Sequence, residues 1–294
     1  MEIIDGKNLS KTIQSEIAQK VEVYTNKGIR KPHLAAVLVG EDPASQVYVR
    51  NKVRSCERVG FSSTLIRKSA DINREELLDI VNELNTSDEI DGFIVQLPLP
   101  KHLDPDEITL AIDPEKDVDG FHPVNFGRMA QGLPAYLPAT PFGILMMLER
   151  YNVETEGKHC VVLGRSNIVG TPMAILMSRK AYPGNCTVTI CHSRTPDIAT
   201  EVKRADIIVA AIGIPEFVKG EMVKDGVVVI DVGINRVDAP EREKGYKLVG
   251  DVDFEAVGAK ASKITPVPGG VGPMTVTALM MNTLKAFEKR FDVS

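Results

Sequence analysis

Short apolar runs alternate with helical patterns from one end of the chain to the other. In the first half, strand-like runs cover residues 33–39, 62–68 and 92–99, with helices between them. The second half repeats the pattern in four further runs, at residues 158–164, 186–191, 205–213 and 226–233. Strands that alternate with helices are typical of βαβ units with a parallel sheet. The later runs are almost continuously apolar, which indicates strands buried on both faces, as in a doubly wound sheet.

The helix after the first strand has clear signals at both ends. Asp42 suits the N-cap, Pro43 suits the first helical position, and Gly60 follows the last turn. These residues predict a helix over residues 44–59. Further helices are expected near residues 143–151 and, as the last element, from Pro273 onward.

A stretch rich in proline and glycine separates the two halves of the chain. It begins at Phe121, reads FHPVNFGRMAQGLPAYLPATP, and precedes the helix expected near residues 143–151. The chain has 294 residues, whereas single hydrophobic cores stop growing at about 250–300 residues. We therefore expect two domains with a boundary near this stretch, and no internal repeat is apparent.

Charge and hydropathy narrow the class of partner. The net charge is -5, whereas nucleic-acid binders normally carry a basic excess on one face, so a small-molecule partner is favoured over nucleic acid. The longest apolar runs are far shorter than the ~20 residues of a membrane helix. The N-terminus MEIIDGKNLSK lacks the basic and apolar regions of a secretory signal. We therefore expect a cytoplasmic protein without membrane contact.

The cysteines and histidines do not indicate a metal site. The four cysteines show no C-x-x-C spacing, and the five histidines show no H-E-x-x-H arrangement. We expect no bound metal and no disulfide framework, with the cysteines serving as small apolar packing residues.

A glycine turn in the second half has the context of a dinucleotide site. The segment VVLGRSNIVGTPMA leads from an apolar strand through Gly164 and Gly170 into a helix, with the pattern G-x-S-x-x-x-G. Backbone N–H groups and a helix N-terminus can face a diphosphate in such a turn. The glycines alone are equally consistent with an ordinary turn between a strand and a helix.

The end of the next strand favours NADP over NAD. NAD sites usually carry an acidic residue there for the ribose hydroxyls, but this chain reads CHSRT, with Ser193 and Arg194, and has Arg165 in the turn. Guanidinium and hydroxyl groups attract a 2′-phosphate, although Arg194 could be an ordinary solvated charge. The loops with Gly213 and Gly233 follow later strands, so they either border the cofactor or serve only as turns.

Lys52 is set apart from the other charges of its helix. On a helical wheel, Ser45, Tyr48 and Lys52 share one shoulder beside the apolar stripe. The remaining charges lie on the solvated face: Arg50, Arg54, Glu57 and Arg58. Lys52 could therefore face a cleft and take part in proton transfer, or its stem could follow the edge of the core while the amine reaches water.

Two polar residues of the first half could complete such a site. Gln96 lies at the carboxyl end of an apolar strand, where its amide could hydrogen-bond a lysine without adding charge; a bond to backbone is the alternative. Asp119 precedes Gly120, a pair that usually forms a turn. Its functional interpretation is a bidentate acceptor for the edge of an amino-pyrimidine ring.

Five segments together closely resemble the bifunctional methylenetetrahydrofolate dehydrogenase/methenyltetrahydrofolate cyclohydrolase family. In chain order they are YVRNK, VQLPLP, KDVDGFHP, GRSNIVG and PGGVGPMT, and they span essentially the whole sequence. The resemblance implies two α/β domains around a cleft, the C-terminal one a Rossmann-like doubly wound parallel sheet. It implies that residues 1–142 and the returning helix 273–294 bind folate, that residues 143–272 bind NADP, and that the protein is a homodimer.

The resemblance also implies roles for individual residues. Lys52 corresponds to the essential cyclohydrolase residue with Gln96 in support, Tyr48 to the aromatic that packs on the folate, and Asp119 to the carboxylate that grips the pterin. The expected substrate contacts are Ser45, Tyr48, Pro268, Gly269 and Gly270. The expected cofactor contacts are Gly164, Arg165, Ser166, Gly170, Ser193, Arg194, Gly213, Gly233 and Ile234.

The implied reaction has two steps. NADP oxidises 5,10-methylenetetrahydrofolate to the 5,10-methenyl form, and water then opens this to 10-formyltetrahydrofolate. One alternative is a monofunctional NAD(P)-dependent dehydrogenase in which Lys52 only anchors substrate. Another is a nucleotide-sensing module without turnover, which would not need the set of Tyr48, Lys52, Gln96 and Asp119.

Overall fold

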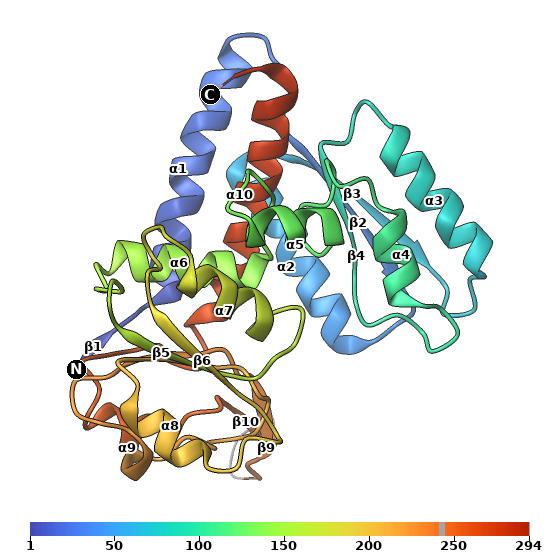
Figure 1. The fold of residues 1–294 in the computed structure, drawn as a ribbon. Helices are drawn as coiled ribbons and strands as arrows, with labels where there is room; N and C mark the ends of the chain where they lie inside the picture. Colours follow the sequence, from blue (N-terminus) through green and yellow to red (C-terminus); the bar gives the residue numbers. More distant parts are fainter. Residues whose placement is uncertain (241–244, 294) are drawn as a thin grey trace. The chain divides into compact units, whose positions relative to one another are not determined.

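The computed structural model describes residues 1–240 and 245–293, and the chain divides into two compact units (Figure 1). The C-terminal unit combines Met1–Ser10 with Thr140–Thr275, and the N-terminal unit combines Lys11–Ala139 with Val276–Ser294. The sequence analysis grouped residues 1–10 with the N-terminal half, whereas they pack with the C-terminal unit. The assignment of folate and NADP to these ranges stays a prediction.

The C-terminal unit is built on a six-stranded parallel sheet of order β1-β11-β8-β7-β5-β6. Its strands are β1 (Glu2–Ile3), β5 (His159–Leu163), β6 (Thr187–Cys191), β7 (Ile207–Ala210), β8 (Val228–Asp231) and β11 (Lys263–Ile264). The chain runs from β5 to the edge strand β6 and then returns to β7 on the other side of β5. The order therefore reverses between β5 and β7, which is where doubly wound sheets bind ligands. The predicted doubly wound parallel sheet is confirmed.

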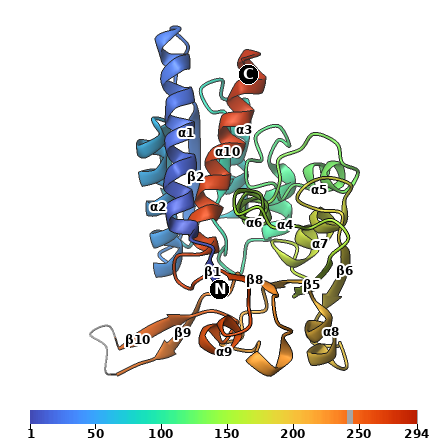
Figure 2. The same cartoon turned by 90° about the vertical axis from the view of Figure 1, so that its left-hand side faces the viewer.

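Short helices and a hairpin complete this unit. The helices are α6 (Ala139–Arg150), α7 (Gly170–Ser178), α8 (Ile198–Arg204) and α9 (Phe254–Gly258), with a 3₁₀ turn η1 at Gly220–Met222. Strands β9 (Asn235–Asp238) and β10 (Tyr246–Val249) pair antiparallel, and in Figure 2 they project from the rest of the unit. The sequence analysis did not predict this hairpin.

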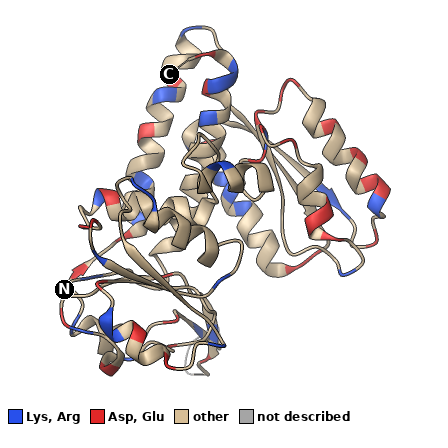
Figure 3. Ribbon diagram, in the orientation of Figure 1, with Lys and Arg blue, Asp and Glu red and all other residues tan. Residues whose placement is uncertain are grey.

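The N-terminal unit contains a three-stranded parallel sheet of order β3-β2-β4. Its strands are β2 (His33–Val39), β3 (Ser62–Lys68) and β4 (Gly92–Val95). The helices are α1 (Gly6–Asn26), α2 (Pro43–Val59), α3 (Arg74–Thr86), α4 (Pro105–Ala111), α5 (Pro123–Ala130) and α10 (Val271–Phe291). Alternate residues of β2 pack on α3 and α4, while α1, α2 and α10 lie on the other side of the sheet (Figure 1). Acidic and basic residues are interspersed along the helices of both units (Figure 3).

The predicted ends of helices and strands are confirmed where the sequence contains clear capping residues, and they differ elsewhere. Asp42 caps α2 by accepting the Ser45 N–H at 2.7 Å, and Gly60 ends the helix with φ 79°. The strand predicted at residues 92–99 stops at Val95, because Pro98 and Pro100 have no N–H to donate to a ladder. Helix α6 begins at residue 139, four residues earlier than predicted, since Pro141 is tolerated in a first turn.

Two further predictions concern burial and length. All four cysteines are buried and free, as expected of packing residues. Within residues 1–240 and 245–293, no helix combines the length and apolar character needed to cross a membrane.

The same pattern of hydrogen bonds occurs within each of the two sheets. Each sheet contains three consecutive strands with matching contacts, β2, β3 and β4 in one and β5, β6 and β7 in the other. The first of the three begins with a histidine, His33 or His159, whose N–H donates at 2.8 Å to an aspartate before the third, Asp91 or Asp206. Each histidine ring also lies 2.9 Å from a threonine hydroxyl on the second strand. At the opposite end, the N–H of Gly40 or Gly164 donates to the last residue of the second strand, at 2.9 and 2.8 Å. Both sheets therefore present their carboxyl ends in the same way.

Candidate active site

Lys52 and Gln96 meet at the carboxyl end of the N-terminal sheet. The Nζ of half-buried Lys52 donates to Oε1 of Gln96 at 3.1 Å. Helix α2 follows β2 and Gln96 follows β4, and these neighbouring strands flank the point where the strand order reverses. The fold thus brings together two residues 44 positions apart in sequence.

The amide of Gln96 is oriented by backbone groups. Its main-chain N–H donates to the Val37 carbonyl at 2.9 Å, which fixes the residue at the end of β4. Its Nε2 donates to the Leu97 carbonyl at 2.7 Å, so Oε1 is the atom that faces the amine. Gln96 can therefore hold Lys52 as a neutral acceptor.

The other two residues on this shoulder of α2 differ in exposure. Tyr48 is 46% exposed, so its expected contact with the substrate stays a prediction, whereas Ser45 is 3% exposed. The N–H and hydroxyl of Ser45 both bond to Asp42. The observed contacts of Ser45 are therefore those of a helix cap, and its expected substrate contact stays a prediction.

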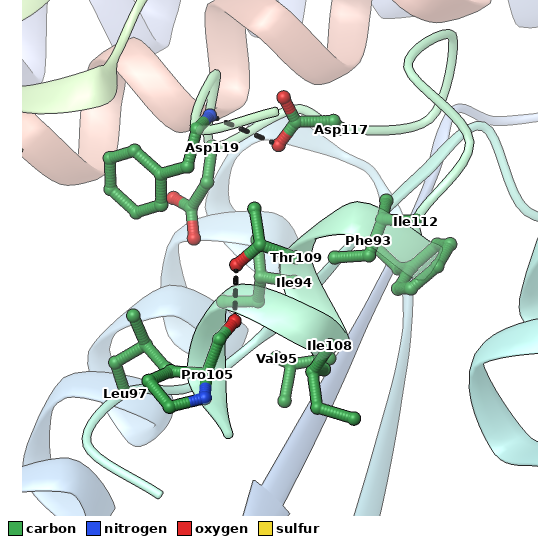
Figure 4. A pocket seen from close by; sticks show the side chains of 11 residues that line it. Phe93, Ile94, Val95, Leu97, Pro105, Ile108, Thr109, Ile112, Asp117 and Asp119 are labelled. Carbon is green, nitrogen blue, oxygen red and sulfur yellow. Dashed lines mark hydrogen bonds between the residues drawn. The ribbon is translucent and has the colours of Figure 1, made fainter. Parts of the chain in front are cut away.

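Asp119 is half-buried and lines a cavity of about 20 Å³ together with Leu97, Thr109 and Phe121 (Figure 4). That volume holds about one water molecule. A larger ligand can reach Asp119 only from outside this cavity. The segment before Asp119 runs beside β4, since Phe93 and Asp117 form an isolated parallel bridge.

Asp117, which the sequence analysis missed, shapes the loop that carries Asp119. Its carboxylate accepts the N–H groups of Gly120 at 3.1 Å, Phe121 at 3.3 Å and His122 at 2.8 Å. The Nδ2 of Asn125 donates to it at 3.0 Å. Burial raises the pKa of Asp117 to about 6. Three of these four donors are backbone N–H groups, so no pattern of side chains in the sequence indicates the role of Asp117.

The glycine turn after β5 is closely packed at both glycines. Gly164 has φ 106°, and a Cβ there would lie 2.3 Å from the Ala211 carbonyl oxygen. A Cβ on Gly170 would lie 2.3 Å from the Gly164 oxygen. The hydroxyl of Ser166 accepts the N–H of Val169 at 3.1 Å, at the start of α7. Only glycine fits these two positions, because any side chain would collide with the backbone around the turn.

The predicted phosphate-binding residues lie at the same edge of the sheet. Arg165, Ser166, Ser193 and Arg194 are all exposed, and they follow the paired strands β5 and β6. The Arg194 N–H donates to Nδ1 of His192 at 3.1 Å, which orders the backbone of this second turn. Guanidinium groups are good phosphate donors, and the phosphate contacts expected of Arg165 and Arg194 stay predictions.

The remaining expected cofactor residues follow β7 and β8. Gly213 and Ile234 are exposed, while Gly233 is buried against Asp251. Asp251 and its neighbour Asp231, both buried, were missed by the sequence analysis.

The expected substrate loop follows β11. Gly269 has φ 109°, and its carbonyl accepts the Lys7 N–H at 2.8 Å. A Cβ on Gly6 would lie 1.9 Å from the Gly270 oxygen, so this loop packs closely on the start of α1. Pro268 is exposed. These contacts are those of a tight connection, and the expected ligand contacts of Pro268, Gly269 and Gly270 stay predictions.

Comparisons with known proteins cover both units. Residues 4–119 match the family model for the tetrahydrofolate dehydrogenase/cyclohydrolase catalytic domain, and residues 138–291 match the model for the NAD(P)-binding domain of the same family. The chain is 59% identical over 290 residues to the bifunctional protein FolD of Flavobacterium johnsoniae, covering 99% of this chain and 98% of the relative.

Solved structures agree with these matches. The bifunctional enzyme FolD, methylenetetrahydrofolate dehydrogenase/cyclohydrolase, from Campylobacter jejuni is similar with a TM-score of 0.93 and 45% identity over 99% of both chains. The Trypanosoma brucei methylenetetrahydrofolate dehydrogenase-cyclohydrolase, complexed with NADP cofactor and inhibitor, is similar with a TM-score of 0.92 and 39% identity over 98% of both chains.

Proposed function

The chain belongs to the tetrahydrofolate dehydrogenase/cyclohydrolase family, and we propose that its N-terminal unit carries the folate chemistry and its C-terminal unit binds NADP. The protein oxidises 5,10-methylenetetrahydrofolate to the 5,10-methenyl form and hydrolyses this to 10-formyltetrahydrofolate. The hydrogen bond between Lys52 and Gln96 supports the second activity, because a dehydrogenase alone does not need an oriented amine.

The residues at the carboxyl ends of β5 and β6 fit NADP. Gly164 and Gly170 allow the turn to pack tightly between β5 and α7, so that N–H groups at the start of this helix can face a diphosphate. Arg165, Ser193 and Arg194 are exposed donors suited to a 2′-phosphate. When bound, this cofactor supplies the acceptor for the hydride. The Trypanosoma brucei relative binds NADP, which supports the same choice here.

Hydride transfer requires alignment more than acid or base. The lone pairs of N5 and N10 drive hydride loss from the methylene bridge and leave a methenyl cation. The protein contributes by holding the folate in position. We assign this to Asp119, as acceptor for the amino-pyrimidine edge, and to Tyr48, whose ring is available for packing.

Hydrolysis requires proton transfer. Water adds to the methenyl carbon, the bond from this carbon to N5 breaks, N5 gains one proton, and one proton is released. We assign the handling of these protons to Lys52. Gln96 holds the amine in place as a neutral hydrogen-bond acceptor.

Two absorbance assays test the proposal and its alternative. The first follows methylenetetrahydrofolate oxidation with NADP and, separately, with NAD; a clear preference for NADP is expected. The second follows loss of methenyltetrahydrofolate without any nicotinamide cofactor, against a heat-denatured control. Enzyme-dependent loss is expected in the second assay. Oxidation without such loss would establish the monofunctional alternative instead.

We also infer a homodimer that works in the cytoplasm, on the basis of family membership. Light scattering should give a mass of about twice the 32.1 kDa of one chain. A mass of one chain at micromolar concentration would contradict the dimer.

A further inference from the structure

Two buried carboxylates lie behind the loops that follow β7 and β8. Asp231 ends β8 and is 4% exposed, and Asp251 follows β10 and is 0% exposed. Neither residue belongs to the predicted site. Their hydrogen bonds nevertheless reach three of the segments that contain predicted ligand residues.

One carboxylate joins the two cofactor loops. Oδ2 of Asp251 accepts the N–H groups of Ile212 at 2.7 Å and Gly213 at 2.9 Å, in the loop after β7. Oδ1 accepts from Nδ2 of Asn235 at 2.9 Å, at the end of the loop after β8. A Cβ on Gly233 would lie 2.2 Å from the same Oδ1. Asp251 therefore determines how these loops sit relative to each other.

Asp231 holds the segment that carries Asp251. Its Oδ1 accepts the N–H groups of Gly233 at 3.0 Å and Asp251 at 2.9 Å, and its Oδ2 accepts the Val252 N–H at 3.0 Å. Its own N–H donates to the Thr265 hydroxyl at 2.7 Å, between β11 and the loop with Gly269. The two carboxylates thus form a rigid support under the strand ends.

The strand order indicates which part of the cofactor this support faces. With the 2′-phosphate at Arg194 after β6 and the diphosphate at the turn after β5, the order β6-β5-β7-β8 leaves β7 and β8 for the other half of the dinucleotide. That half carries the nicotinamide, which accepts the hydride. The loops joined by Asp251 are those nearest to it.

We propose that Asp251 is a positioning residue for hydride transfer: it sets the Gly213 and Gly233–Ile234 loops against the nicotinamide half of NADP. This rests on the proposed function. A displacement of about 1 Å can cost roughly a hundredfold in rate, so the loops need such a support. Hydrolysis uses no nicotinamide and does not depend on it.

The contact with Asn235 allows a swap experiment. Asn235→Asp places two carboxylates against each other at Oδ1 of Asp251, and no rotation of either side chain supplies a donor. The double variant Asp251→Asn with Asn235→Asp restores a donor and an acceptor. We expect the single variant to lower kcat for oxidation about tenfold or more, and the double variant to recover most of it. Cyclohydrolase activity should stay within about twofold of wild type in both.

Asp206→Asn is the matched control. Asp206 also accepts a backbone N–H, from His159 at 2.8 Å, but at the opposite end of the same sheet. It should leave the rate of oxidation and the NADP affinity unchanged. Asn235→Ala, which removes only one bond to Asp251, should lower oxidation by a smaller factor and serves where Asn235→Asp does not fold.

Three results would overturn the proposal. The first is unchanged oxidation in Asn235→Asp or, where that variant does not fold, in Asn235→Ala. The second is an equal loss of oxidation and hydrolysis. The third is a folded double variant without recovery. A wild-type protein without oxidation would instead refute the proposed function, so the two failures are distinguishable.

Discussion

Replacing Lys52 by methionine should separate the two activities. Methionine keeps an unbranched, flexible stem of similar length, so the packing of α2 is retained. The amine is lost, and with it the 3.1 Å bond to Gln96. We expect hydrolysis of methenyltetrahydrofolate to be nearly abolished while much of the NADP-dependent oxidation remains.

The magnitudes favour a selective effect. General acid–base catalysis by one side chain contributes about 10²–10⁴ in rate, which corresponds to roughly 3–5 kcal/mol in the barrier. The lost hydrogen bond contributes about 1–3 kcal/mol to stability, and Lys52 is only half-buried. A stability loss of this size lowers both activities together, whereas the barrier change acts on hydrolysis alone.

The assay measures both steps on the same preparation. Hydrolysis is followed without nicotinamide cofactor, oxidation with saturating NADP, and folding by circular dichroism. Arg54→Met is the control, because it removes a positive charge from the exposed face of the same helix. It should leave both rates unchanged. Equal losses of the two activities in Lys52→Met, or full retention of both, would refute the role assigned to the amine.

Three further predictions concern the cofactor turn and the loop of Asp119. Arg165→Ala and Arg194→Ala should each weaken NADP about tenfold to a hundredfold, from the loss of a charge-assisted bond, with a smaller effect on NAD; equal losses in cofactor titrations would contradict this. Gly170→Ala should weaken NADP at least about tenfold by calorimetry, because its Cβ would lie 2.3 Å from a backbone oxygen, whereas Gly127→Ala has open space and should not. Asp117 has a pKa of about 6 instead of 3.8, so the folded state binds its proton more tightly and this carboxyl contributes most to stability below pH 4. The free energy of unfolding should therefore fall by about 2 kcal/mol from pH 4 to 6 relative to Asp117→Asn in denaturant titrations; parallel pH profiles would exclude the buried proton.

Much of the fold follows from local chemistry. The buried strands β2, β5 and β7 are continuous apolar runs, and α2 carries its cap residues in the sequence. The hairpin of β9 and β10 was not predicted, since its strands have only four residues each, half-buried or exposed. Pairing between two such strands is a tertiary property that no apolar run indicates.

The sequence predicted those site residues whose side chains interact with each other. The helical wheel isolates Lys52, and the strand end presents Gln96, and the structure joins the two. Asp117, Asp231 and Asp251 escaped because their partners are mainly backbone N–H groups of loops. Such acceptors look like ordinary loop aspartates until the loop is folded around them.

The hydrogen bonds that the histidines make in both sheets lie at one end of the strands, and the residues predicted to bind ligands lie at the other end. In both, the histidine, aspartate and threonine hold the amino ends of three strands together, while the opposite ends carry the Lys52–Gln96 hydrogen bond in one case and a glycine turn in the other. New ligand chemistry can therefore arise by altering the loops alone, without disturbing the contacts that hold the strands together.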